Sequence, residues 1–389
     1  MPAYDIAALR KFVAPEFVFG AGAADLTGQF AANLAIKKAL VVSGPVLEGL
    51  GTPGRVIDSL TEAGIRSVLF TGVSPNPRDT EVMIGADLYQ RTGCDSIIAV
   101  GGGSPMDCAK GIGIVCTNEQ HILDFEGVDN VERPGPPLIC IPTTAGTAAD
   151  ISQFCIINDT GRKVKIAIVS KTMVPDVALI DPLLTMTMDE ELTAHTGLDA
   201  LTHAVEAYVS NASSPVTDLN ALEAVRLINQ HLISAINNPQ NAESRTGMML
   251  ASTYAGLAFS NAILGAVHAM AHSLGGLLDL PHGLCNAILL DHVIDYNFDA
   301  VPNRFRSLGN VLGATISENA PLDEVREATL ASFRNLKQAA GVSVSLCDLG
   351  MTTEDLPALA NKALADACML TNPKQPTDSE VIKIYEAAC

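Results

Sequence analysis

Six short runs of mostly apolar residues, rich in Val and Ile, recur through the first 182 residues and limit what this chain can fold into. The runs are KALVV (38–42), RSVLF (66–70), SIIAV (96–100), PLICI (137–141), KIAIV (165–169) and DVALI (176–180). Apolar residues at consecutive positions are typical of strands that helices cover on both faces. Segments with helical spacing separate the runs. The pattern predicts a Rossmann-like α/β domain with a parallel sheet over residues 1–182.

The pattern changes after residue 182, where long segments rich in Ala, Leu and Glu have helical spacing. Examples are the segments 189–209, 214–236 and 321–341. A chain of 389 residues exceeds what one hydrophobic core usually serves. We therefore expect a second, all-helical domain over residues 183–389.

One apolar stretch, residues 253–278, approaches the length of a membrane span. It contains His268 and His272, and two imidazoles at mid-span are costly in lipid. The sequence therefore predicts a buried core helix and no membrane partner.

The charge balance argues against nucleic acid as a partner. Forty-three acidic residues against 24 basic residues give a formal net charge of −19, which repels phosphate backbones. Nine cysteines show no paired spacing, and an odd count cannot close into a complete set of disulfides. The first 17 residues carry charges and show no export signal. These features predict reduced thiols and a cytoplasmic protein.

Two polar loops follow neighbouring predicted strands. Residues 101–104, Gly-Gly-Gly-Ser, come directly after the strand 96–100 and precede a helical segment, an arrangement that exposes backbone N–H groups to an anion. By itself this loop is equally well explained as a tight turn. A second loop carries Thr143, Thr144 and Thr147 after the strand 137–141. Open α/β sheets bind ligands at the carboxyl ends of their strands, so the two loops together predict a dinucleotide site.

The first strand is followed by Gly44, and the usual glycine fingerprint is absent there. A carboxylate at this position normally binds the adenosine ribose and repels a 2′-phosphate. Gly44 provides neither effect, which predicts that NADP(H) is accepted beside NAD(H).

Five potential metal ligands fall in two short segments. Asp199 and His203 are four residues apart, and so are His268 and His272, so each pair shares one face of a helix. His282 follows in a Pro-His-Gly turn. Any one of these residues is more often an ordinary core or surface side chain. Together, one carboxylate and three imidazoles favour Fe(II) or Zn(II), and the remaining histidine is then a proton relay beside the metal.

These motifs resemble the iron-containing (group III) alcohol dehydrogenases, which belong to the dehydroquinate-synthase-like superfamily. The resemblance covers nearly the whole chain and rests on GGGSPMDCAK, IPTTAGTAAD, VALIDPLLT, TGLDALTHAVEAY, GAVHAMAHSLGGLLDLPHG and DACMLTNPKQPT. It implies a Rossmann-like domain followed by an all-helical domain, in keeping with the patterns above.

The resemblance also implies a role for particular residues. The implied metal ligands are Asp199, His203, His268 and His282, with His272 as the catalytic neighbour. The implied cofactor-binding residues are Gly44, Gly101, Gly102, Gly103, Ser104, Asp107, Thr143, Thr144, Thr147 and Lys165. The implied substrate-pocket residues are Phe154, Phe259 and Cys368.

The expected protein is therefore a metal-dependent NAD(P) alcohol dehydrogenase or aldehyde reductase that acts on a small primary alcohol or aldehyde. It would use Fe2+, with Zn2+ as the other candidate, and form a homodimer or a higher homo-oligomer. Two alternatives stay open at this point. One is another enzyme of the superfamily, such as a glycerol or polyol dehydrogenase, and the other is a non-catalytic nucleotide-binding scaffold.

Overall fold

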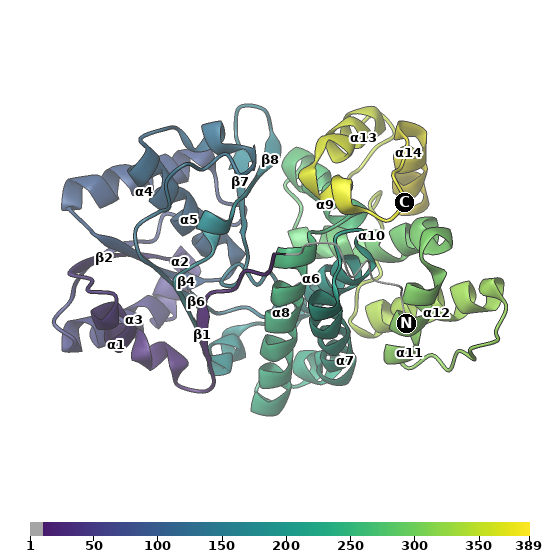
Figure 1. Cartoon of the computed structure of the whole chain (residues 1–389), viewed down its shortest axis with the longest axis horizontal. Coiled ribbons are helices and arrows are strands. Elements are labelled where there is room, and N and C mark those ends of the chain that lie inside the picture. The colour runs from purple at the N-terminus through teal and green to yellow at the C-terminus, as the bar shows by residue number, and fades with distance from the viewer. Residues whose placement is uncertain (1–10) are drawn as a thin grey trace. The chain divides into compact units, whose positions relative to one another are not determined.

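The computed structural model describes residues 11–389, which fall into two compact units. One unit comprises residues 13–187 and contains all the strands, and the other contains the helices from residue 188 onward (Figure 1). The α/β half and the all-helical half that the sequence predicts are both present.

A six-stranded sheet forms the centre of the first unit. Its strands are β1 (Glu16–Phe19), β2 (Lys38–Val42), β3 (Arg66–Phe70), β4 (Ser96–Gly101), β6 (Leu138–Pro142) and β9 (Val177–Ile180). They lie in the order β1-β9-β6-β4-β2-β3, and every neighbouring pair is parallel. After β3 the chain returns to the other side of β2 to form β4. The carboxyl ends of β2 and β4 thus flank a reversal of strand order, where such sheets bind ligands.

Helices cover both faces of this sheet (Figure 1). These helices are α1 (Thr27–Asn33), α2 (Pro45–Gly49), α3 (Thr52–Glu62), α4 (Asp79–Thr92) and α5 (Gly103–Asn118). Alternate residues of a strand point to opposite faces. Val41 of β2 packs in a cluster with Val56 and Leu60 of α3, whereas Leu40 packs in a separate cluster with Ile112 of α5. This two-sided burial explains why the strands read as continuous apolar runs.

One predicted strand lies elsewhere. The run 165–169 forms β8 (Val164–Val169), which the sequence places in the parallel sheet, and that placement is wrong. β8 pairs antiparallel with β7 (Phe154–Asp159) and parallel with β5 (Gly127–Val128) in a separate three-stranded sheet. The short turn 160–163 between β7 and β8 favours a hairpin, since parallel neighbours need a longer crossover.

The second unit is built from helices alone among the residues that the structure describes. They are α6 (Glu190–Val209), α7 (Pro215–Asn237), α8 (Ala242–Ala262), α9 (Ala266–Leu278), α10 (His282–Asn297), α11 (Pro302–Val311), α12 (Leu322–Ala339), α13 (Leu356–Ala365) and α14 (Asp378–Ala387). The apolar stretch 253–278 spans the end of α8 and all of α9, with His268 and His272 both buried. Between residues 11 and 389 no single helix is long and apolar enough to cross a membrane; α8 and α9 meet that measure only as a pair bent by 100°.

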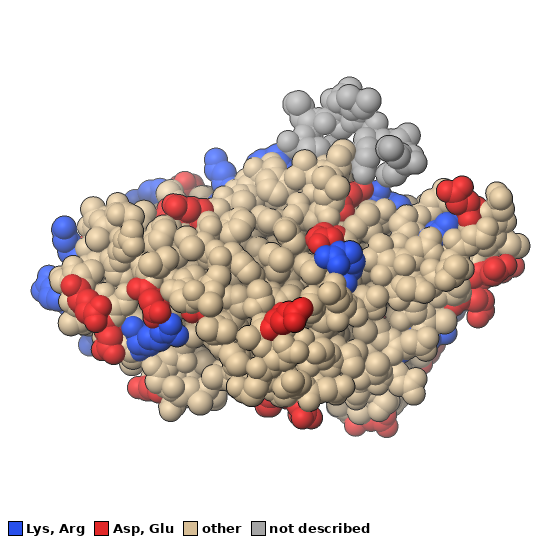
Figure 2. All heavy atoms as spheres, turned by 90° about the horizontal axis from the view of Figure 1, so that it is seen from below, with Lys and Arg blue, Asp and Glu red and all other residues tan. Residues whose placement is uncertain are grey.

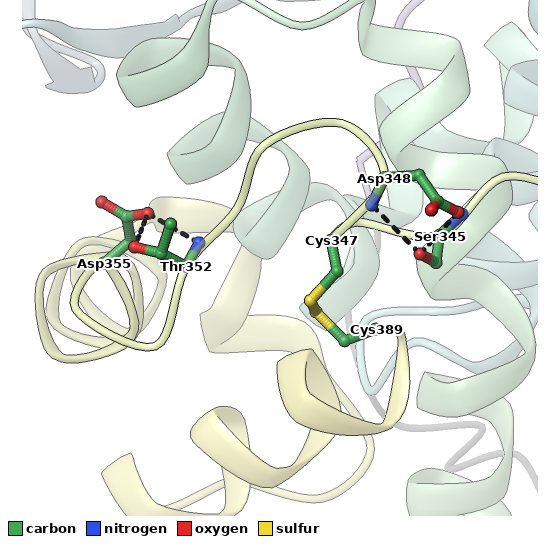
Figure 3. The surroundings of a disulfide bond; sticks show 6 residues. All are labelled: Ser345, Cys347, Asp348, Thr352, Asp355 and Cys389. Atoms are coloured by element: carbon green, nitrogen blue, oxygen red, sulfur yellow. Dashed lines mark hydrogen bonds between the residues drawn. A yellow bond between two sulfur atoms is a disulfide. The ribbon is translucent and has the colours of Figure 1, made fainter.

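The cysteines differ from expectation at one place. Cys347 and Cys389 form a disulfide between the loop after α12 and the end of the chain after α14 (Figure 3). The prediction that all thiols are reduced is wrong for this pair, because a separation of 42 residues hides the contact from any spacing rule.

On the surface shown in Figure 2, acidic and basic side chains are interspersed among uncharged ones.

Candidate metal and dinucleotide sites

The two polar loops of the first unit lie against each other. β4 and β6 are parallel neighbours, with Gly101 opposite Pro142, and the Thr143 N–H donates to the Gly101 carbonyl at 3.0 Å. A Cβ on Gly102 would lie 2.9 Å from Thr144 Oγ1. The structure therefore brings together the glycine loop and the threonine loop, which the sequence could only place after separate strands.

The first and third positions of this loop leave little room for a side chain. Gly101 has φ +152°, and a Cβ there would lie 2.6 Å from Pro105 Cγ. A Cβ on Gly103 would lie 3.1 Å from Thr147 Cγ2. α5 begins at Gly103, so its free N–H groups and positive dipole end face the loop, together with Ser104. This arrangement suits a pyrophosphate.

Gly44 lies beside this loop at the carboxyl end of β2. Its neighbour Ser43 donates through Oγ to the Val100 carbonyl at 2.9 Å, which joins the ends of β2 and β4. Gly44 has φ −104°, and a Cβ there would lie 3.5 Å from the Val73 carbonyl oxygen, an ordinary contact. The position can therefore carry a side chain without strain.

Asp107 and Lys165 interact electrostatically within the α/β unit. Burial raises the pKa of Asp107 to about 7, against the opposing effects of Lys110 and Lys165. Lys165 lies on β8, and its Nζ donates to Asn76 Oδ1 at 2.7 Å. The Lys110 Nζ is buried and donates to the carbonyls of Ser152 and Phe154, so Lys110 fixes α5 to the start of β7.

In the helical unit, three of the expected metal ligands converge. Asp199 Oδ1 lies 3.8 Å from His268 Nε2 and 3.7 Å from His282 Nε2. Metal bonds of about 2.1 Å in a tetrahedral site place ligand atoms roughly 3.4 Å apart, close to these separations. Asp199 and His268 are buried, and His282 is half-buried. The donor set of one carboxylate and imidazoles suits Fe(II) or Zn(II).

His203 lies beside this cluster in a different manner. Its Nδ1 is 4.0 Å from the other oxygen of Asp199, Oδ2. Its ring stacks between those of Phe259 and His268, at centroid distances of 4.3 and 4.5 Å. The fourth expected ligand is thus adjacent to the site, and its role as a ligand stays a prediction.

Asn286 shows that the cluster is built for an additional group. It lies one turn after His282 on α10, and its Nδ2 donates to Asp199 Oδ1 at 2.6 Å and lies 3.2 Å from both His268 Nε2 and His282 Nε2. Its Oδ1 is buried and has no hydrogen-bond partner among residues 11–389. The three atoms that Nδ2 approaches are a carboxylate oxygen and two imidazole nitrogens, which are donor types that bind a cation, so the residues present fit a metal site.

The carboxylates and imidazoles of the cluster stabilise each other's charged forms. Burial by itself raises the pKa of Asp199, but His203, His268 and His282 together hold it far below its ordinary value. Burial lowers the pKa of His268, but Asp199 and Glu206 raise it more, to about 9.

His272 is one turn beyond His268 on α9 and lies outside the three-atom cluster. Its Nδ1 is 2.9 Å from Asp366 Oδ2, and its ring stacks on His282 at 5.2 Å. Cys368 lies close to the same pair, since its N–H donates to Asp366 Oδ1 at 2.8 Å. His272 is therefore held by a carboxylate and has contact with an expected ligand.

The expected pocket residues fall in both units. Phe259 and Cys368 are buried in the helical unit, near His203 and Asp366 respectively. Phe154 is buried at the start of β7 in the α/β unit. Their part in a substrate pocket stays a prediction.

Comparison with known proteins decides the family. Residues 14–182 match the family model described as iron-containing alcohol dehydrogenase, and residues 193–389 match the model for the C-terminal part of the Fe-containing alcohol dehydrogenase family. This chain belongs to the iron-containing alcohol dehydrogenase family. The predicted family and the dehydroquinate-synthase-like fold are thereby confirmed, and the chain is an oxidoreductase that acts on alcohols.

Individual relatives within this alcohol dehydrogenase family are similar over almost their whole length. A 1,3-propanediol dehydrogenase of Klebsiella pneumoniae is 42% identical over 372 residues, which cover 95% of this chain and 96% of the relative. A lactaldehyde reductase of Escherichia coli is 37% identical over 372 residues, covering 95% and 97%. A solved 1,3-propanediol oxidoreductase has a TM-score of 0.95 at 41% identity, covering 98% of this chain and 100% of that one.

Three residues that touch the site were not predicted from the sequence, namely Glu206, Asn286 and Asp366. Asn286 is four residues after His282 and Glu206 three after His203, so helical spacing from a predicted ligand could have pointed to both. No local signal joins Asp366 to His272, which is 94 residues away.

Proposed function

We propose that this alcohol dehydrogenase uses Fe2+ and a nicotinamide dinucleotide to interconvert a short primary alcohol and its aldehyde. The convergence of Asp199 Oδ1, His268 Nε2 and His282 Nε2 carries the proposal, with His203 as the fourth ligand. Zn2+ suits the same donor atoms and is the competing ion.

The dinucleotide would bind at the carboxyl ends of β2, β4 and β6. Gly101, Gly102, Gly103 and Ser104 would bind the pyrophosphate through the start of α5, with Thr143, Thr144 and Thr147 beside them. Asp107 and Lys165 would contact the nicotinamide half. Because Gly44 offers no carboxylate to a 2′-phosphate, both NAD(H) and NADP(H) would be accepted.

The chemistry follows from these residues. Bound Fe2+ would supply Lewis-acid polarisation of the substrate oxygen, and the nicotinamide would supply a donor or acceptor for the hydride. His272 would carry the hydroxyl proton between substrate and solvent. Its Nδ1 is held by Asp366, which leaves Nε2 as the atom that accepts and releases that proton.

The substrate would be a small alcohol or aldehyde. Phe259 and Cys368 offer apolar surface close to the metal residues. Relatives named for 1,3-propanediol, methanol and lactaldehyde act on short alcohols or aldehydes, which supports this substrate class.

The decisive experiment is a substrate panel. Short alcohols and aldehydes are assayed with NAD(H) and NADP(H) after anaerobic reconstitution with Fe(II) or Zn(II). We expect turnover that depends on the metal and is lost in His282→Ala. His272→Ala should keep its metal and lose rate. Turnover by chelated enzyme, or full metal content in His282→Ala, would contradict the assignment.

We also propose a cytoplasmic homo-oligomer. Seven of the nine cysteines are free thiols, which supports a reducing compartment, and the Cys347–Cys389 disulfide is the one pair that needs an oxidant to form. β1 is an edge strand of its sheet, with Phe17 40% exposed, and an unpaired edge is a surface on which a second copy can pair. Light scattering on a size-exclusion column measures the subunit count, and a monomer at all concentrations would contradict this proposal.

A further inference from the structure

Glu206 is a buried carboxylate on α6 with two short contacts to the next metal-bearing helix. Its Oε1 accepts the Val267 N–H at 2.6 Å, and its Oε2 lies 2.6 Å from His268 Nδ1. Only 4% of Glu206 and 1% of His268 is exposed. One side chain thus contacts both the backbone at the start of α9 and the ring of an expected ligand.

The contact fixes which nitrogen of His268 faces the ligand cluster. Nδ1 points to Glu206, and Nε2 points to Asp199 Oδ1 at 3.8 Å. A carboxylate oxygen accepts, so Nδ1 carries the proton and donates it. Nε2 is then the nitrogen that faces the cluster and binds either a second proton or a cation, as metal-bound imidazole requires.

The start of α9 needs acceptors at this place. Gly265, the residue before the helix, offers no capping side chain, and the first N–H groups are taken by two distant residues. Asn372 Oδ1 accepts from the Ala266 N–H at 3.1 Å, beside the contact of Glu206 with Val267. The positive end of the helix dipole also stabilises a carboxylate there. A Cβ on Gly265 would lie 2.9 Å from both acceptor oxygens, so the fit depends on glycine.

We propose that Glu206 is a positioning residue of the metal site, which orients His268 for metal binding and at the same time caps α9. It joins α6, which carries Asp199 and His203, to α9, which carries His268 and His272. The inference rests on the proposed metal function and gives a role to a residue outside the expected ligand set.

Glu206→Gln tests the proposal with almost no change of shape. The amide offers one acceptor and one donor where two acceptors are needed, so either Val267 or His268 loses its partner. Loss of such an outer contact typically costs 10- to 100-fold in metal affinity. We expect this loss for Fe(II), measured anaerobically by competition with a chelator. In the Co(II)-loaded protein the visible ligand-field bands should shift, because the His268 donor has changed.

Asp291→Asn is the matched control. Asp291 is a buried carboxylate on α10, the helix of His282, and it bonds Arg334 at 2.8 Å as well as Lys337. The change also removes a buried charge without a change of shape. We expect lower stability of this variant with wild-type Fe(II) affinity and a wild-type Co(II) spectrum. Equal loss of metal in both variants would overturn a specific role for Glu206.

Gly265→Ala keeps the Glu206 carboxylate but displaces it from its present position. The added methyl group would push against Glu206 Oε1, so weaker Fe(II) binding is expected here too, and this variant decides the matter if Glu206→Gln does not fold. Wild-type affinity and spectrum in either folded variant would overturn the proposal. If the wild-type protein itself binds neither Fe(II) nor Zn(II), the proposed function fails, which is a different result.

Discussion

Gly283→Ala should separate two helices that carry metal ligands. Gly283 follows His282 on α10, and a Cβ there would lie 2.3 Å from the His195 carbonyl oxygen and 2.8 Å from its carbonyl carbon. These are backbone atoms of α6, the helix that also carries Asp199, so no side chain can rotate away. Ordinary contact is about 3.4 Å, and α10 must therefore move by about 1 Å.

The expected magnitude follows from that displacement. Overpacking of a tight contact costs about 1–3 kcal/mol, and Ala returns up to about 1 kcal/mol of helix propensity, so a net loss of about 1–2 kcal/mol in unfolding free energy is expected. Metal sites tolerate shifts of only about 0.2 Å in ligand distance. A shift of about 1 Å between His282 and Asp199 should reduce Fe(II) affinity more than tenfold, or about 1.4 kcal/mol.

The assay pairs urea unfolding of the metal-free protein with chelator competition for Fe(II). Gly197→Ala on α6 is the control, because its Cβ would meet Leu232 Cδ1 at 2.4 Å and Met248 Cε at 3.0 Å, the ends of flexible side chains. This variant should keep wild-type Fe(II) affinity. Wild-type affinity in Gly283→Ala as well would refute the argument that the close approach of α6 and α10 sets the ligand geometry.

Three further predictions concern other parts of the molecule. Gly44→Asp should lower kcat/KM for NADPH relative to NADH by roughly tenfold, about 1.4 kcal/mol; unchanged cofactor ratios in steady-state kinetics would show that Gly44 does not face the ribose. Cys389→Ser opens the 42-residue loop closed with Cys347 and should cost up to about 4 kcal/mol in oxidising buffer. Reductant should destabilise the wild type and leave this variant unchanged, as followed by urea denaturation. Burial raises the pKa of Asp107 to about 7 from its ordinary value of 3.8, so the folded protein binds this proton more tightly than the unfolded chain, and the associated stability is lost as pH rises through that interval. As pH rises from 3.8 to about 7, the unfolding free energy of Asp107→Asn should therefore fall less than that of the wild type. Parallel pH profiles of the two proteins would contradict burial of the Asp107 carboxyl as the cause.

Much of this molecule could be predicted from local sequence. Strands such as 38–42 and 66–70 were predicted at their observed bounds, because residues covered on both faces must be apolar at every position. The pairs Asp199–His203 and His268–His272 could be placed on single helix faces, because a helix brings residues four apart to the same side.

Other features depend on contacts between segments that are distant in sequence. The run 165–169 has the composition of a central strand, but its short turn to residues 154–159 makes it half of a hairpin outside the main sheet. The link between Cys347 and Cys389 depends on where α14 ends relative to the loop after α12.

The site shows the same division. Residue type and helical spacing determined the candidate ligands, because side-chain chemistry and helix geometry are local properties. Only the packing of α6 against α9 and α10 decided that Glu206 reaches His268, that Asn286 points at the ligand atoms and that His203 stacks beside them. A buried side chain takes the partners that tertiary packing brings within hydrogen-bond distance, and the linear sequence does not contain those distances.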